Sequence, residues 1–406
     1  MITRRALASR LAHRGIAAWT VVERDQTIGY ADDALARTEH RSSLSLVVHH
    51  DVPSGRGSAR LELDALAGSA DDAIDDALTL ATAAIGPAWM TSPPAAPARV
   101  ALADAALAAR EVGAIASSIV RDVASARAEV LREKVSVDGH GGFHTEWDAT
   151  ALRASALVVV GGRSLAVSCS ARRLADLGLD TAVAAAAADL ALVAAASGPP
   201  PSASALVLSA DAMLHGGGFG IWSVFAHQAD AVIERQGLTR YRLHSEVAPG
   251  AAAAVDPLVL SSDGALDYAE LSAPLSDDGV AIRRFSVIDR GIASGLALSP
   301  REAALRGADP NGGMRNLVVA PGSWSSSLPA GALDVRRLGS FSVDLATGAA
   351  TLELALSVLD GRPFTGGTIR LDLISALARA RKSSRLVQRG AYSGPASVML
   401  SDVELL

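Results

Sequence analysis

His227 is the residue whose type and surroundings most invite metal chemistry, because it lies in an apolar stretch of helical character, FGIWSVFAHQADAVIERQG, at 219–237. A hydrolytic zinc site needs three protein ligands, an open position for water and a carboxylate that takes the proton of that water. Trp222 and Ser223 precede His227, but an indole nitrogen has no lone pair for a metal and an unactivated serine is a poor base. No second histidine or cysteine lies within one helical turn. We therefore predict that His227 is partly buried and satisfied by hydrogen bonds.

A second set of possible metal ligands lies in one Gly-containing segment and consists of His140, His144, Glu146 and Asp148. These are ligand types that zinc and other divalent metals accept. The segment reads as a loop or hairpin on which the two histidines need not converge, so a solvated turn is the favoured interpretation. His49 and His50 are adjacent on a predicted strand and point to opposite faces, which prevents them from sharing one ion.

Other catalytic patterns are absent from the sequence. It has no GxSxG motif and no cysteine near a histidine, and Ser323–Ser327 reads as a flexible loop. The run Gly216–Gly218 lacks the spacing of a phosphate-binding loop. We expect this run to let the backbone approach closely at the start of the helix, beside His215.

The composition bounds the class of protein. With 406 residues, 50% of them apolar, the chain can form two or three domains with sizeable cores. A net charge of −6 without a long run of like charges argues against a nucleic-acid surface.

Cys169 is the single cysteine, so we expect no internal disulfide. Residues 1–18 lack the apolar core of a signal peptide, so we expect the cytoplasm. The uncharged run Leu190–Ala210 is interrupted by prolines and reads as helix end, linker and strand rather than a membrane span.

Hydrophobic periodicity predicts the elements of the N-terminal half. Helices are expected to end near His13, to run from a Ser69 cap to about Ala84, to span 103–123 and to run from Asp180 to about Ala196. Alternating patterns predict strands at 17–25, 42–52, 58–64, 128–139, 143–149, 154–162 and 164–173, and 90–98 is a Pro-rich connection.

The C-terminal half is predicted to be mostly β. The prolines at 199–201 mark the boundary between a domain at 1–198 and a domain at 202–406. A strand opens the second domain at 204–209, residues 340–361 form a hairpin that turns at Thr347-Gly348, and 397–406 closes the chain as a strand. The fold class expected is α+β, with an N-terminal α/β domain and a mostly β C-terminal domain.

Two segments resemble the TldD/TldE (PmbA) family. Active TldD-type subunits carry HExxxH, followed by an arginine and a glycine eight and ten residues after the second histidine. His227, Arg235 and Gly237 keep that spacing here. Residues 272–307, with the reversal Asp289-Arg290-Gly291, also follow the family's order of strand, turn, strand and short helix.

The resemblance implies that the metal site is degenerate in this chain. Trp222 stands where the first zinc-binding histidine is expected, Ser223 where the water-activating glutamate is expected, and Ala391 about where a cysteine ligand is expected. It therefore implies no catalytic, cofactor-binding or metal-binding residue in this chain. The implied function is that of a non-catalytic TldE-type subunit in a heterodimeric zinc metallopeptidase. Zinc would be held by a TldD-type partner, and the substrates would be unstructured or modified precursor peptides.

Two other functions stay open at this point. The chain could be a homodimer that holds a peptide without cutting it. This function needs the same dimer surface as the heterodimeric subunit, so the sequence does not separate the two. It could also be an enzyme with a new site around His140, His144 or His215. Neither interpretation calls for nucleic acid or a membrane as partner.

Overall fold

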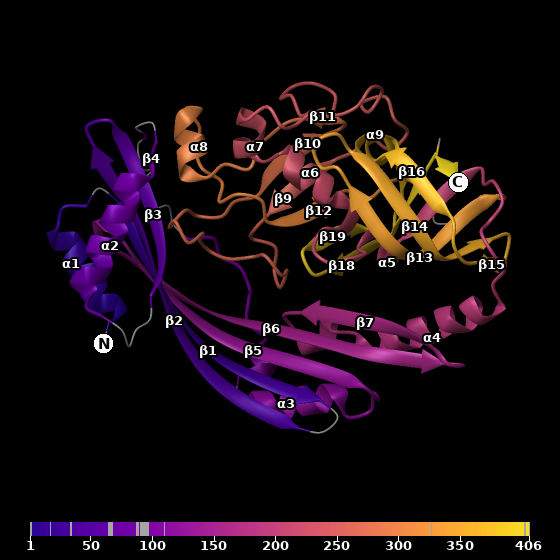
Figure 1. The fold of residues 1–406 in the computed structure, drawn as a ribbon, viewed down its shortest axis with the longest axis horizontal. Helices are drawn as coiled ribbons and strands as arrows, with labels where there is room; N and C mark the ends of the chain where they lie inside the picture. Colours follow the sequence, from indigo (N-terminus) through magenta and orange to yellow (C-terminus); the bar gives the residue numbers. More distant parts are fainter. Residues whose placement is uncertain are drawn as a thin grey trace.

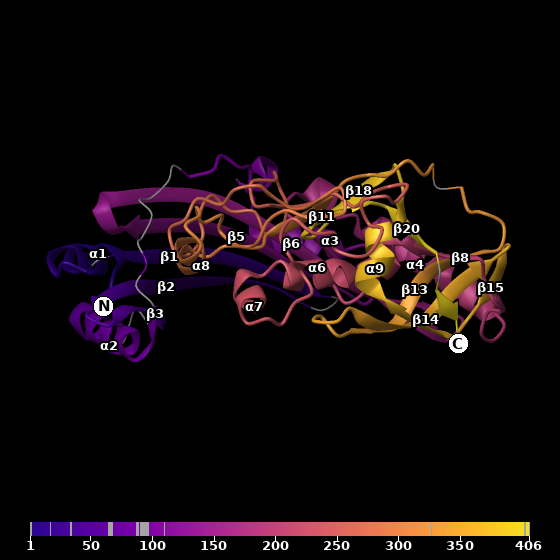
Figure 2. The same ribbon diagram turned by 90° about the horizontal axis from the view of Figure 1, so that it is seen from above.

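A computed structural model of the chain describes residues 2–16, 18–32, 35–63, 68–86, 89, 97–108, 110–325, 327–401 and 403–405. It has a mixed α+β fold built on three sheets, which confirms the predicted fold class. Figure 1 shows the N-terminal half as a long curved sheet with helices on its outer side, and the C-terminal half on the other side of that sheet. Figure 2 shows from above that the molecule is elongated, with the C-terminal half lying along the sheet.

The N-terminal sheet has seven strands in the order β4-β3-β2-β1-β5-β6-β7, and all neighbours are antiparallel. The strands are β1 (Ala18–Asp32), β2 (Ala36–Val52), β3 (Gly55–Leu63), β4 (Ile85–Gly86), β5 (Ala126–Gly139), β6 (Phe143–Val160) and β7 (Arg163–Ala171). The prediction of two strands at 143–149 and 154–162 is wrong, because β6 is continuous. Its buried side chains alternate without a break from Thr150 to Val158, as one long strand requires.

Four helices cover one face of this sheet: α1 (Arg4–His13), α2 (Ala70–Ala83), α3 (Val112–Val120) and α4 (Leu179–Ala195). The predicted Ser69 cap is confirmed, since its side chain accepts a hydrogen bond from the Asp72 amide. The helix predicted at 103–123 is much shorter, because the Glu111 carboxylate caps α3 and only the 3₁₀ turn η1 (Ala105–Leu107) precedes it. Most of the Pro-rich connection lies outside the described residues.

Helix α4 continues from the 3₁₀ turn η3 (Leu174–Asp176), and together the stretch Leu174–Ala195 is long and apolar enough to cross a membrane by length and composition alone. In this fold its Leu179, Ala186 and Leu190 side chains are buried in the core that it shares with β6 and β7. The 3₁₀ turn η2 (His140–Gly142) joins β5 to β6.

Two sheets and five short helices make up the described part of the C-terminal half. The six-stranded sheet has the order β11-β10-β9-β12-β19-β18, and the larger sheet runs β17-β20-β8-β13-β14-β16-β21 with β15 beside β14. The helical elements are α5 (Ala210–Met213), η4 (Gly220–Trp222), α6 (Ser223–Gln228), α7 (Ala231–Arg235), α8 (Pro300–Leu305) and α9 (Leu373–Arg379). The strands are β8 (Ala205–Ser209), β9 (Leu260–Asp263), β10 (Phe285–Asp289), β11 (Ile292–Ala293), β12 (Asn316–Val319), β13 (Ala332–Val343), β14 (Ala349–Leu359), β15 (Arg362–Phe364), β16 (Thr368–Asp372), β17 (Arg381–Lys382), β18 (Leu386–Arg389), β19 (Tyr392–Pro395), β20 (Ser397–Leu400) and β21 (Glu404–Leu405).

The predicted hairpin in this half is confirmed, because β13 and β14 are antiparallel neighbours joined by a turn that includes Thr347-Gly348. Gly348 has a φ of +78°, a conformation that glycine adopts without steric cost. The predicted closing strand is instead two short strands, β20 and β21, which lie at different places in the larger sheet.

Polar contacts join the two halves at several places. Arg172 after β7 donates to the carbonyl oxygens of Ala269, Glu270 and Ser272 at 2.9, 2.8 and 3.1 Å. Asp277 forms ion pairs with two arginines of the N-terminal sheet. Asp189 of α4, whose side chain is only 9% exposed, binds two arginines of β13. The boundary that the prolines predict at 198–202 stays a prediction, and the contacts hold both sides of it together.

The Asp189 contact gives a testable expectation. Its carboxylate accepts from Arg337 at 2.8 Å and from Arg336 at 3.3 Å, so Asp189→Ala leaves a partly buried guanidinium with fewer partners. We expect the free energy of unfolding to fall by about 2–3 kcal/mol in urea denaturation. Thr181→Ala on the exposed side of the same helix should change it by less than about 0.5 kcal/mol. Equal effects of the two substitutions would show that the bridge does not stabilise the fold.

Candidate functional site

The segment that carries His227 begins with a glycine-rich turn. Gly216, Gly217 and Gly218 all have positive φ angles, which makes glycine the fitting residue there. The predicted close approach of backbone is not at these residues, because a Cβ at any of them would meet nothing within 4 Å. It occurs at Gly220, where a Cβ would lie 2.0 Å from the Met213 carbonyl oxygen. Gly220 therefore lets η4 and α6 pack against the end of α5.

Trp222 fills the interior beneath this helix. Its side chain is fully buried, and its ring lies 6.1 Å from the Tyr392 ring at an interplanar angle of 21°. The Phe225 ring lies 6.3 Å from it on the same helical segment. Such offset aromatic pairs stabilise a core beyond the area that they bury. The indole, at the end of η4 and directly before α6, thus joins this helical segment to β19, which is far away in the sequence.

Tyr392 is the residue that the sequence interpretation missed, although it follows Ala391 directly. It is fully buried, its hydroxyl donates to the Pro395 carbonyl oxygen at 3.0 Å, and burial raises the pKa of that hydroxyl. Ala391 is itself buried, and its carbonyl oxygen accepts from the Leu317 amide at 2.8 Å. The structure therefore brings the segment around 391 to the helical segment at 222.

His227 matches the prediction in its burial but not in its hydrogen bonding. The residue is partly buried, but its Nε2 atom is enclosed and has no hydrogen-bond partner among the described residues. Asp230, one turn later, is a carboxylate that the sequence interpretation did not include. It accepts from the amides of Val232 and Ile233 and so serves as the N-cap of α7.

The next residue along α6, Gln228, anchors the helix. Its side chain is buried, donates to the carbonyl oxygens of Leu345 and Ala346, and accepts from the amides of Arg240 and Tyr241. All hydrogen-bonding capacity of the amide is used in this way, which fixes α6 against the turn between β13 and β14.

Arg235 and Gly237, which carried the family spacing, serve the fold. Arg235 donates to both oxygens of the buried Glu302 carboxylate in α8. Arg306 donates to the same carboxylate at 2.6 Å and to Glu234 at 2.9 Å. Burial alone would raise the pKa of Glu302, but the hydrogen bonds from the two arginines outweigh it and lower the pKa. Gly237 has a φ of +73° just after α7.

The side chains at the degenerate positions do not fit a zinc ion. An indole, a hydroxymethyl group and a methyl group stand at 222, 223 and 391, which leaves the His227 imidazole as the one metal ligand among the four. No group of three or more His, Cys, Asp or Glu side chains that could hold a metal occurs in the part of the chain that the structure describes. These four residues therefore do not support zinc chemistry.

The other histidines lie at separate places. His144 Nδ1 is 2.7 Å from an oxygen of Asp138, which also binds Arg4, whereas His140 lines a cavity with His49. His140 and His144 thus do not converge, as the turn interpretation predicts. His49 is buried and His50 is half-buried, in line with their expected opposite faces. His215 lies just beyond α5 and joins none of them in a metal-binding group of described residues.

Substitution of Trp222 tests how far the stack supports the fold. Because Trp222 is fully buried against Tyr392 and Phe225, Trp222→Ala should lower the free energy of unfolding by about 3–5 kcal/mol. Trp222→Phe keeps an aromatic ring and should cost about 1–2 kcal/mol. Urea denaturation of both variants measures this. A loss below about 1 kcal/mol for the alanine variant would contradict the packing account.

Comparison with known proteins bears on the same C-terminal region. Residues 217–405 match the sequence profile of the PmbA/TldA metallopeptidase C-terminal domain. No curated protein sequence shows significant similarity to the chain.

Three solved structures share the fold. A candidate modulator of DNA gyrase from Bacteroides thetaiotaomicron has a TM-score of 0.77 at 16% identity, with 100% of this chain and 99% of that chain covered. TldE from Thermococcus kodakarensis has a TM-score of 0.73 at 15% identity, with 98% and 100% covered. A candidate modulator of a DNA gyrase from Thermotoga maritima has a TM-score of 0.76 at 15% identity, with 98% of each chain covered. The fold is therefore shared over the whole length, and residues 217–405 match the C-terminal domain of the PmbA/TldA metallopeptidase family.

Proposed function

We propose that this chain is the non-catalytic, TldE-type subunit of a heterodimeric zinc metallopeptidase. The observation that carries the proposal is the complete burial of Trp222, stacked on Tyr392, at the position of a zinc-binding histidine in active family members. A buried indole takes up interior space that a metal with its open water position would need. The similarity in fold to TldE from Thermococcus kodakarensis adds support.

A subunit without a metal can still shape a peptide-binding cleft. Two related chains that pack about a pseudo-twofold axis present similar surfaces to each other, and a cleft between them depends on backbone shape as much as on metal ligands. In this chain α6 is fixed by Gln228 and by the Trp222 stack, so its surface is held rigidly. We infer that this subunit contributes the dimer interface, one wall of the cleft and the entry for the substrate. The TldD-type partner binds zinc and cuts unstructured or modified precursor peptides.

The homodimeric peptide-binding protein is the second candidate. It rests on the same filled site, because a chain without a metal could hold a peptide and cut nothing. The two candidates differ in one respect, which is whether activity appears when a TldD-type chain is added.

Co-expression with a TldD-type partner tests the proposal. The two chains should elute together in a 1:1 complex that cleaves an unstructured peptide, while this chain alone should not. The partner alone is the control. If the chains elute separately at micromolar concentration, and the partner is fully active alone, the subunit function is wrong.

A variant within that complex separates a silent histidine from a working one. His227→Gln should leave kcat/KM within a few-fold, because a residue away from the working metal makes no contact with the transition state. Replacing the glutamate of the partner's HExxxH motif by glutamine should remove about 10²–10⁴-fold of the rate, since general-base catalysis is lost. A drop of more than about a hundredfold for His227→Gln in a well-folded complex, roughly 2.7 kcal/mol in the barrier, would place this subunit in the chemistry.

A further inference from the structure

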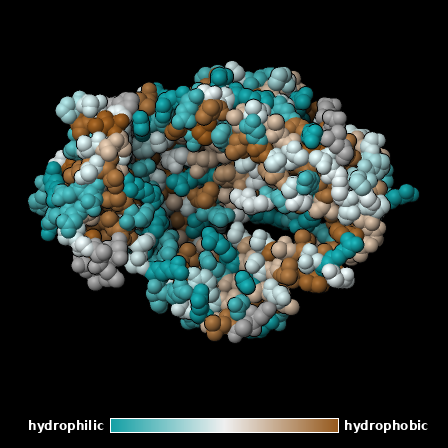
Figure 3. Space-filling view, in the orientation of Figure 1, coloured by the Kyte–Doolittle hydropathy of each residue, from teal (hydrophilic) through white to brown (hydrophobic). Residues whose placement is uncertain are grey.

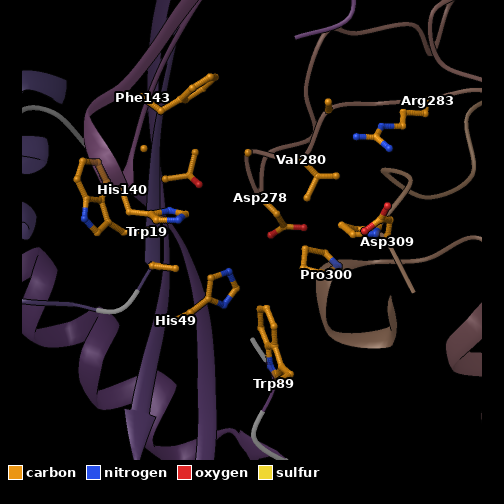
Figure 4. A pocket seen from close by; sticks show the side chains of 16 residues that line it. Trp19, His49, Trp89, His140, Phe143, Asp278, Val280, Arg283, Pro300 and Asp309 are labelled. Atoms are coloured by element: carbon orange, nitrogen blue, oxygen red, sulfur yellow. The ribbon is translucent and has the colours of Figure 1, made fainter. Parts of the chain in front are cut away.

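A cavity of about 290 Å³ lies between the open face of the N-terminal sheet and the C-terminal half. Figure 3 shows the surface hollowed between these two parts of the molecule. Figure 4 shows that side chains from both halves line the cavity, and none of positions 222, 223, 227 and 391 takes part. The N-terminal side supplies His49, Trp89, His140 and Phe143, and the C-terminal side supplies Asp278 and the start of α8 at Pro300.

His49 is the buried polar group of this cavity. Its side chain belongs to a residue only 8% exposed, and its Nδ1 atom lies 2.8 Å from the Ser58 hydroxyl oxygen on the neighbouring strand. Its Nε2 atom has no partner among the described residues, and the ring points into the cavity in Figure 4. Burial, together with the charges of Arg56 and His140, lowers the pKa of His49 to about 4. The imidazole is therefore uncharged at neutral pH. In the tautomer whose Nδ1–H donates to the Ser58 hydroxyl, Nε2 presents a lone pair to the cavity.

Trp89 holds the imidazole in place from the side. Its ring meets His49 edge to face, with ring centroids 4.9 Å apart. The Arg56 guanidinium lies over the Trp89 ring at 5.0 Å and also pairs with Asp51, so its charge is already matched. This wall of the cavity is thus aromatic and close to neutral.

Asp278 faces this wall with a carboxylate that lacks a direct partner. Its neighbour Asp277 is paired with Arg24 at 2.8 Å and Arg60 at 2.6 Å. No described residue donates a hydrogen bond to the Asp278 side chain or forms an ion pair with it. Asp278 is an exposed residue, and solvent reaches its carboxylate through the cavity. Desolvation by the surrounding protein and the charge of Asp277 raise the pKa of Asp278, while Arg60 and Arg315 act in the opposite direction.

The remaining charges of the cavity balance each other. Arg283 and Asp309 both line it from the C-terminal side, both are exposed, and their charges are opposite. Asp278 is therefore a charged residue of the cavity wall for which no described lining residue provides an ion-pair partner. A metal ion is not the cation that neutralises Asp278, because His49, His140 and Asp278 do not form a group of described residues that could hold one.

We propose that this cavity binds a primary ammonium group on a short alkyl chain. The ammonium carries three donors, of which one meets the Asp278 carboxylate and one the Nε2 lone pair of His49, while the alkyl chain lies against Trp89. Aromatic rings next to a carboxylate are the usual surroundings of organic cations. The volume is at the lower end of the roughly 300–1,000 Å³ typical of ligand pockets, which suits one side chain of lysine size. This site does not depend on the proposed subunit function.

Isothermal titration calorimetry on the full chain tests the proposal with Nα-acetyl-lysine amide at neutral pH and low salt. The matched control ligand is Nα-acetyl-norleucine amide, which has the same hydrocarbon chain without the ammonium. We expect the norleucine compound to bind at least about tenfold more weakly, because the charge-assisted hydrogen bonds are lost. Asp278→Asn should weaken lysine-amide binding at least about tenfold, whereas Asp289→Asn on the exposed β10–β11 hairpin should change it less than about twofold.

The source of the ammonium group is distinguished with a blocked, unstructured peptide that carries one central lysine. Binding as tight as that of the single residue would point to lysine side chains of polypeptides, and binding more than about tenfold weaker would point to a small free amine. The proposal is overturned if lysine amide fails to bind at millimolar concentration, or if norleucine amide binds equally well. Unchanged affinity in Asp278→Asn would also overturn it, and the ligand comparison on the unmodified chain needs no variant to fold.

Discussion

The aromatic stack of Trp222 on Tyr392 is the contact around which the C-terminal half is organised. It buries two of the largest side chains of the described core and ties the helical segment of η4 and α6 to β19. Because indole and phenol rings are rigid, such a pair fixes the distance and angle between the elements that carry them. The same helix is then held from its other end by Gln228, whose amide groups are all used.

This packing holds the fold together at positions of which only His227 could bind a metal. The aromatic contact joins the helical segment at 220–228 to β19. The Nε2 atom of His227 is left without a partner among the described residues. A single imidazole does not make a zinc site. The arginine that keeps the family spacing, Arg235, stabilises the neighbouring helices through Glu302.

The cavity between the halves follows from how they dock. Asp277 binds two arginines of the N-terminal sheet, and this contact places the adjacent Asp278 on the wall of the cavity that His49 also lines. Gly279, in the same loop as Asp277, lies close to Thr20 of β1. A Cβ at position 279 would lie 3.3 Å from the Thr20 hydroxyl oxygen, which leaves little room for a larger residue there. One loop of the C-terminal half thus binds the N-terminal sheet through Asp277 and supplies the carboxylate of the proposed ammonium site through Asp278.

Much of the fold could be predicted from local patterns in the sequence. The candidate site around Trp222 and the cavity between the halves could be predicted only in part. Alternating apolar and polar residues predicted most strands. The predicted break within β6 was wrong, because a change of composition inside one strand was taken for a turn. The short α3 depends on a Glu111 cap that the apolar pattern hides. The degenerate positions could be named from their spacing. The Trp222–Tyr392 contact and the meeting of His49 with Asp278 could not, because each joins segments far apart in the chain through the tertiary packing.

The central claim is that this chain has lost the ability to hold zinc and leaves the metal to a partner. Elemental analysis of the chain purified alone, after dialysis against a chelator, tests it most directly. The account predicts far less than one zinc per chain, because Trp222 and Ala391 offer no ligand beside His227. One tightly held zinc per chain, together with chelator-sensitive peptide cleavage, would contradict it.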